Sequence, residues 1–199
     1  MPLIPLLLSL AVPAQPALTR EILAEINFAR AQPRRYAERL RGYRALFKGK
    51  VVYYPGNPDG LLTKEGVKAV DEAIRFLEKQ PPLDPIAPSS LLARAARDHV
   101  EEQGPRGATG HISKDGANPR DRVQRRGGGN YVAEVITYGP PSATEVVRQL
   151  IVDDDVPGRG HRRTMFAAEM RYAGVACGPH RVYRVMCVAE LGRTIDGQP

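Results

Sequence analysis

Residues 171–191, R-Y-A-G-V-A-C-G-P-H-R-V-Y-R-V-M-C-V-A-E-L, decide the fold prediction. Apolar and polar residues alternate on both sides of G-P-H-R, as they do in strands with one buried face, so this stretch predicts an antiparallel hairpin. Most of the chain before it has helical periodicity, with no repeated strand–helix–strand order. Helices first and strands last indicate an α+β fold, in which a small antiparallel sheet is covered by helices.

The upstream elements are predicted from the spacing of apolar residues. Apolar residues that recur every three or four positions indicate amphipathic helices. The predicted helices cover residues 20–31, 34–47, 64–79, 91–103, 143–152 and 161–170, and a further strand covers residues 131–138. Residues 104–129 are rich in Gly, Arg and Pro and lack periodicity, so they are expected to form a long loop with a functional role or high mobility.

The overall composition is that of a soluble globular protein. A chain of 199 residues fits one domain, and its 42% hydrophobic and 26% charged residues are ordinary for this class. The net charge of +7 favours weak association with acidic surfaces such as envelope polymers. Because only 6% of the residues are aromatic, few side chains could stack on the bases of single strands, and no specific nucleic-acid partner is expected.

The N-terminus predicts export. Residues 1–17 form an apolar run that is too short to span a bilayer but fits the apolar region of a signal peptide. Val12 and Ala14 provide a small-residue cleavage site, although Lys and Arg are missing before the apolar run. A buried N-terminal segment is the alternative. The predicted division is therefore a signal peptide over residues 1–17 and a single domain over 18–199, located outside the cell or in its envelope.

The two cysteines are predicted to be free. If the hairpin turns near residues 178–181, Cys187 lies well along the returning strand and pairs opposite a residue near Tyr172. Cys177 would then be too far away for a disulfide, whose geometry is narrow. Two largely buried thiols are expected.

Histidines and carboxylates beside chain-bending residues suggest a metal site. His161 follows the break P-G-R-G and begins a predicted helix, whose positive end favours the neutral imidazole that binds metals. His111 lies between glycines, and Glu134 is a carboxylate in the apolar run A-E-V-I, where it needs a partner. Zinc accepts such imidazole and carboxylate ligands. The alternatives are a loop histidine bonded to backbone, a helix-start residue and an outward-facing glutamate.

The order of several motifs resembles the CAP superfamily (cysteine-rich secretory proteins, antigen 5 and pathogenesis-related 1), in its bacterial form. The motifs cover nearly the whole chain after the leader except residues 48–80, where an extra helical segment is expected. They are I-N-F-A-R-A-Q-P-R-R-Y-A-E-R-L (26–40), L-L-A-R-A-A-R-D-H (91–99), G-H-I-S-K-D-G-A-N-P-R-D-R (110–122), A-E-V-I-T-Y-G (133–139), G-H-R-R-T-M-F (160–166) and the closing hairpin (174–190).

The resemblance implies an α–β–α sandwich with a cleft that holds an optional divalent metal, commonly zinc. It assigns His111, His161 and Glu134 to that cleft. The family's second acid comes from W-x-x-E, which is matched only by L-I-V-D, ending at Asp153. Asp154 or Asp155 could take its place instead. The predicted metal ligands are thus His111, His161, Glu134 and Asp153.

The remaining histidines and arginines receive simpler interpretations. His99 lies on a helix among apolar residues and is expected to be a hydrogen-bonded core histidine, whereas His180 lies in the predicted turn and is expected to be exposed. Arg159, Arg162 and Arg163 flank His161 and could bind an anion beside the metal. A solvated surface is the preferred interpretation of these arginines.

These features favour an extracellular binding module for a small hydrophobic or anionic ligand, with metal optional, over an enzyme. Roles of that kind are what the resemblance implies, because a settled enzymatic activity is not characteristic of the family. A metal-dependent hydrolase that uses zinc-bound water and Glu134 or Asp153 as its base is the first alternative. An envelope-associated protein that binds acidic polymers is the second.

Overall fold

The computed structural model describes residues 15–199 and contains a central four-stranded sheet with the order β4-β6-β7-β5. Three strands pair antiparallel, as predicted, and a two-residue edge strand pairs parallel with β6. The strands are β4 (Ala87–Pro88), β5 (Val132–Tyr138), β6 (Tyr172–His180) and β7 (Arg184–Gly192).

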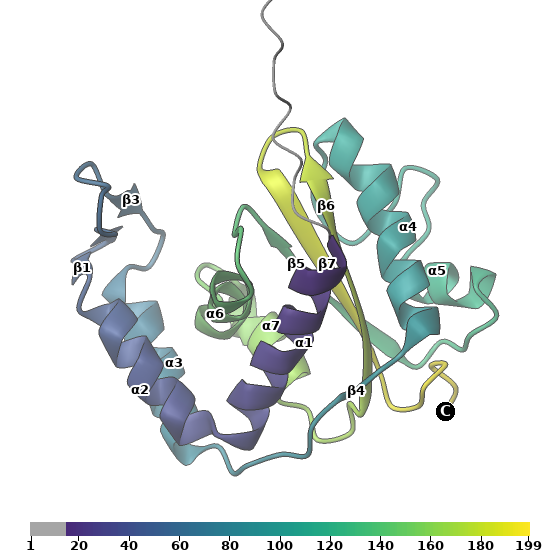
Figure 1. Cartoon of the computed structure of the whole chain (residues 1–199), viewed down its shortest axis with the longest axis horizontal. Coiled ribbons are helices and arrows are strands. Elements are labelled where there is room, and N and C mark those ends of the chain that lie inside the picture. The colour runs from purple at the N-terminus through teal and green to yellow at the C-terminus, as the bar shows by residue number, and fades with distance from the viewer. Residues whose placement is uncertain (1–14) are drawn as a thin grey trace, which may run out of the picture.

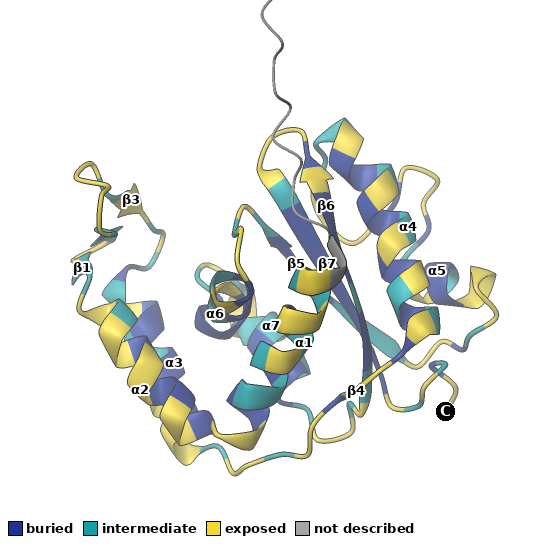
Figure 2. Cartoon of the chain, in the orientation of Figure 1, coloured by how far each residue is buried: buried dark blue, intermediate teal, exposed yellow. Residues whose placement is uncertain are grey.

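Helices cover both faces of this sheet, which confirms the α–β–α sandwich (Figure 1). One face packs against α4 (Ser90–Arg106), which α5 (Pro119–Arg125) adjoins. The other face packs against α1 (Gln15–Ala31), α6 (Ala143–Val152) and α7 (Gly160–Met165). In Figure 2 the inward faces of these helices are buried and their outward faces are exposed.

Strand β7 shows how the sequence alternation produces two cores. Met186 and Val188 pack with Ala96 and Val100 of α4. The residues that point to the other face, Cys187, Ala189 and Leu191, join the larger core with α1 and α6. Because side chains alternate between faces of a strand, one strand can serve both layers. Helix α4 also approaches β6 closely at Gly174, where an added Cβ would lie 1.8 Å from the backbone nitrogen of Ala93.

The 48–80 segment, the part of the chain for which no motif was recognised, is only half helical. It ends in α3 (Val67–Lys79), which packs between α2 (Pro33–Arg44) and α6. Before α3 lies a small antiparallel sheet of β1 (Phe47–Lys48), β2 (Val51–Val52) and β3 (Leu61–Leu62). These two-residue strands are too short to show a sequence period. In Figure 1 they form a separate lobe beside the sandwich.

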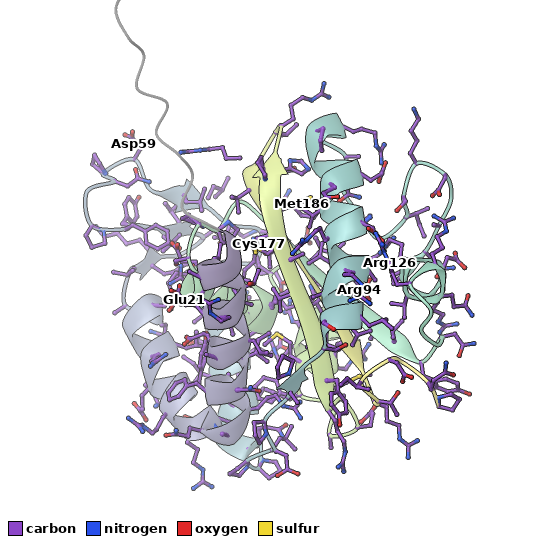
Figure 3. All side chains as sticks on the ribbon, turned by 45° about the vertical axis from the view of Figure 1, so that its right-hand side comes forward. Glu21, Asp59, Arg94, Arg126, Cys177 and Met186 are labelled. Carbon is purple, nitrogen blue, oxygen red and sulfur yellow. A yellow bond between two sulfur atoms is a disulfide. The ribbon has the colours of Figure 1, made fainter. Side chains whose placement is uncertain are left out.

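The prediction of free cysteines is wrong, because Cys177 and Cys187 form a disulfide. Strands β6 and β7 continue to His180 and Arg184, so the turn occupies only the three residues between them. The later turn places Cys187 directly opposite Cys177, with their Cα atoms 4.1 Å apart. Both residues are buried, as predicted, and Cys177 lies on the sheet (Figure 3).

Other boundaries differ from the predictions. The expected long loop over residues 104–129 is shortened by the end of α4 and interrupted by α5, which begins with a capping box between Asn118 and Asp121. Helix α7 ends at Met165 rather than at residue 170. Residues 1–14 of the predicted signal peptide lie outside the described residues, and residues 15–17 begin α1. Among the described helices, none is both long and apolar enough to cross a membrane.

Candidate functional site

His161 is held by Asp153, the C-cap residue that follows helix α6. Asp153 has a left-handed backbone (φ 56°), and its carboxylate points back toward the start of α7. One oxygen lies 2.7 Å from His161 Nδ1, and the other accepts hydrogen bonds from the backbone N–H groups of His161 and Arg162. The Asp153 side chain is almost fully buried, so the imidazole orientation is set from inside the protein.

His111 is held in the same way by Glu134. Its Nδ1 atom lies 2.8 Å from Oε1 of Glu134, a buried side chain in the middle of β5. The other carboxylate oxygen, Oε2, accepts a hydrogen bond from Arg122 on α5. Because a carboxylate accepts at each Nδ1, these nitrogens carry the protons and each Nε2 atom offers a lone pair.

Arg122 anchors this side of the cleft and was not predicted as a functional residue. Its guanidinium is buried and donates to the backbone oxygens of His111 and Ala117 and to Ser113 Oγ, besides Glu134. It therefore fixes both the loop that carries His111 and the carboxylate that orients the ring. A buried arginine usually has hydrogen-bond acceptors, and two of the acceptors of Arg122, the backbone oxygen of His111 and the carboxylate of Glu134, belong to site residues.

Glu190 is a second acid that the sequence predictions missed. It lies on β7 directly opposite Glu134, with no exposed surface, and Arg122 Nη2 is 3.6 Å from its carboxylate. Burial and the negative charge of Glu134 raise the pKa of Glu190 well above its usual range. Burial opposes the ionisation of Glu134, but the hydrogen bond to His111 and the Arg122 charge lower its pKa.

The two histidine rings face one another across a groove of about 940 Å³. Their centroids are 6.4 Å apart, and within residues 15–199 no group is hydrogen-bonded to Nε2 of either ring. The rings come from separate elements of the groove lining, since His111 lies in the loop before α5 and His161 lies in the first turn of α7. The structure thus brings together His111, His161, Glu134 and Asp153.

The site offers a divalent ion two protein ligands, the Nε2 atoms of His111 and His161. The two Nε2 atoms are suited to zinc, and each carboxylate lies behind its imidazole, where such groups orient metal-binding histidines. No cluster of three or more His, Cys, Asp or Glu side chains suited to a metal occurs within residues 15–199. Solvent or a bound ligand would have to complete the coordination. Metal binding at the four predicted residues remains a prediction.

Two further histidines test the sequence interpretation. His99 is buried and contacts Ser113 Oγ and the backbone oxygen of Gly110, which confirms a hydrogen-bonded core histidine. The prediction that His180 is exposed is wrong. It is 2% exposed, because it is the last residue of β6 and its ring contacts the backbone of Ala108 and accepts from the turn that follows.

Arg163 is exposed, as predicted, but Arg159 and Arg162 are held by carboxylates. Arg159 forms ion pairs with Glu65 and Glu72, and Arg162 is buried and pairs with Glu72. Neither is a solvated surface residue, and neither guanidinium is available to bind an anion in the groove. Hydrogen bonds from Arg159 lower the pKa of Glu65 to about 2.

A family model described as "CAP: Cysteine-rich secretory protein family" matches residues 36–190. The chain belongs to the CAP family. The matched range contains both histidines and both carboxylates of the cleft. In this CAP-family protein, Asp153 rather than Asp154 or Asp155 contacts the second histidine.

Two solved structures are similar to this CAP-family chain. One is an outer surface protein from Borrelia burgdorferi, with 15% identity and a TM-score of 0.46, covering 55% of this chain and 77% of that one. The other is an extracellular protein containing a SCP domain from Bacillus anthracis str. Ames, with 19% identity and a TM-score of 0.45. That match covers 71% of this chain and 45% of the Bacillus protein. No curated protein sequence matches the chain significantly.

Proposed function

We propose that this CAP-family protein is a secreted binding module whose cleft holds a divalent metal, zinc first, and a small hydrophobic or anionic ligand. One observation carries the proposal. Two imidazoles whose Nε2 atoms have no hydrogen-bond partner within residues 15–199 line one groove, and each is oriented through Nδ1 by a buried carboxylate. Buried carboxylates that fix imidazoles in the tautomer required for metal binding are costly to maintain without a function at Nε2.

Three charged residues of the chain orient the two histidines of this site. Glu134 and Asp153 hold the rings of His111 and His161, and Arg122 holds Glu134 in turn. Zinc, when bound, would supply a positive centre able to attract an anionic group of the ligand. The remaining coordination positions would be open to that group or to water.

The groove beyond the histidines supports a ligand with apolar and anionic parts. Its walls are rich in aromatic and aliphatic side chains, an ordinary lining for a small-molecule site. The cationic side chains Lys64 and Arg148 also line it. The apolar lining includes Tyr43, Tyr54, Leu61, Leu62, Tyr138, Pro140, Pro141 and Tyr183.

The carboxylates favour binding over hydrolysis. A general base needs an oxygen that can reach the attacking water. Glu134 has one oxygen on His111 and the other on Arg122, and Asp153 has one on His161 and the other on backbone N–H groups. Each therefore lacks an uncommitted oxygen. The apolar leader and the net charge of +7 support export and weak association with acidic envelope polymers.

A zinc titration tests the proposal. The full chain should bind one zinc ion, and His111→Ala/His161→Ala should weaken binding at least 100-fold, measured by calorimetry with elemental analysis of the dialysed protein. Asp59→Ala is the control, because Asp59 is an exposed carboxylate on the loop between β2 and β3, where its side chain points away from the sandwich (Figure 3). Equal zinc affinity in the wild type and the double variant would refute the site.

A further inference from the structure

The 48–80 segment is fastened to the stretch of chain that carries His161. Arg159 lies two residues before His161, and its guanidinium donates to both oxygens of Glu65 at 2.5 and 2.7 Å. The same guanidinium reaches Glu72 at 2.6 Å and the backbone oxygen of Asp153 at 2.8 Å. We call Arg159, Glu65 and Glu72 the Arg159 clamp. A planar guanidinium that serves two carboxylates is geometrically specific.

Further contacts tie the same two stretches together. The carboxylate of Asp154 accepts hydrogen bonds from the backbone N–H groups of Lys64 and Glu65, each 2.8 Å long. The N–H of Asp155 donates to Glu65 in return, at 2.7 Å. Arg162, buried behind His161, donates to Glu72 and to the last carbonyl groups of α6. The contacts are reciprocal, so each stretch restrains the other.

The backbone before His161 needs such restraint. Asp153, Asp155 and Arg159 all have positive φ angles, of 56°, 64° and 55°, which residues other than glycine rarely adopt. Strained conformations of this kind persist only where surrounding contacts determine them. The clamp holds Arg159 itself and the carbonyl of Asp153, whose carboxylate orients His161.

The same segment also forms a wall of the groove. Tyr54, Leu61, Leu62, Thr63 and Lys64 line the groove that contains both histidines. Leu61 and Leu62 of β3 are 56% and 73% exposed, although polar residues are more usual at positions as exposed as these. Exposed neighbouring leucines at the edge of a groove are typical of a ligand-contacting surface.

We propose that the 48–80 segment is a functional part of the site: through the Arg159 clamp it positions His161, and it supplies part of the wall of the groove that contains both histidines. Glu65, Glu72 and Arg159 are positioning residues, since they act on His161 through the backbone and Asp153. The consequence for metal and ligand rests on the proposed function. The positioning of the His161 ring does not, because it concerns the metal-free protein.

Histidine NMR of the full chain tests the clamp. In Arg159→Gln and in Glu65→Gln/Glu72→Gln, the side-chain ¹⁵N resonances of His161 should shift or broaden in the metal-free protein, while those of His111 stay unchanged. Zinc affinity should fall at least tenfold. Arg126→Gln is the matched control, because it breaks a paired arginine–carboxylate contact with Asp98 on the α4 side of the sheet and should change neither readout (Figure 3).

The outcomes separate the two proposals. If the His161 side-chain resonances are as little changed in the clamp variants as in Arg126→Gln, the positioning role is overturned. If wild-type protein binds no zinc but the clamp variants still disturb His161 alone, the clamp holds and the proposed metal function fails. Should Arg159→Gln not fold, Glu65→Gln alone removes charge from a partly exposed side chain, and an undisturbed His161 there would equally overturn the proposal.

Discussion

Arg122→Met should lower the free energy of unfolding by about 3–5 kcal/mol, the usual cost of breaking a buried ion pair by removing one partner. The change leaves Glu134 buried without its cation and removes hydrogen bonds to the loop that carries His111. Glu190, directly opposite Glu134 on β7, is itself an acid and cannot supply a positive charge in place of Arg122. Glu134 would itself take up a proton, which limits the loss and weakens its hold on His111. Urea unfolding followed by circular dichroism measures the change.

Arg120→Met provides the control for that experiment. Arg120 lies on the same helix, α5, but is exposed, so this substitution should change the unfolding free energy by less than about 0.5 kcal/mol. Arg122→Lys should fall between the two, since an ammonium retains the charge but cannot form the same set of hydrogen bonds. Equal stabilities for Arg122→Met and Arg120→Met would mean that the buried hydrogen bonds of Arg122 do not stabilise this side of the cleft.

Asp153→Asn should lower zinc affinity by about 10–100-fold, the usual effect of changing a group that orients a metal-binding histidine. Asparagine tolerates the left-handed backbone at this position, so the fold should persist. Its amide, however, has one acceptor oxygen where Asp153 uses two, toward His161 Nδ1 and toward the N–H groups that begin α7. Zinc calorimetry measures the loss.

Asp155→Asn is the matched control for this second prediction. Asp155 also has a positive φ angle and also lines the groove, but its side chain is exposed and contacts neither histidine. Zinc affinity within a factor of about two of the wild type is expected. An equal loss in both variants would show that removing any negative charge weakens zinc binding, and that orientation by Asp153 is not the cause.

The sequence identified the cleft residues because each lies beside a chain-bending motif or in an improbable setting. His111 and His161 are both adjacent to glycines, and Glu134 is a lone carboxylate in an apolar strand. The substitution of Asp153 for the family's glutamate left three neighbouring aspartates as alternatives. Only the left-handed turn at the end of α6 selects Asp153 as the contact of His161, and nothing in three consecutive aspartates encodes that choice.

Glu190 could have been found by the argument that identified Glu134. Both are carboxylates in apolar strand sequences, and the predicted strands made them candidates for pairing. Arg122 lacked such a signal, because its burial depends on α5, which the Gly- and Pro-rich composition of residues 104–129 concealed. The Asn118 and Asp121 capping box was the cue for this helix.

The disulfide and the Arg159 clamp depend on features that local patterns do not specify. A hairpin turn predicted near residues 178–181 instead of 181–183 shifts the register by several positions, and that shift separated Cys177 from Cys187 in the prediction. The clamp joins side chains more than eighty residues apart, Arg159 with Glu65 and Glu72. Charged residues on a predicted helix face give no indication of a partner that distant.

Long-range ¹H–¹⁵N spectra of the histidine side chains, recorded before and after addition of zinc, test the central claim most directly. The structure predicts that His111 and His161 are both protonated at Nδ1 in the metal-free protein, and that zinc shifts the Nε2 resonances of these two residues while those of His99 and His180 stay unchanged. Protonation at Nε2 in either ring, or zinc-dependent shifts confined to other residues, would contradict the account.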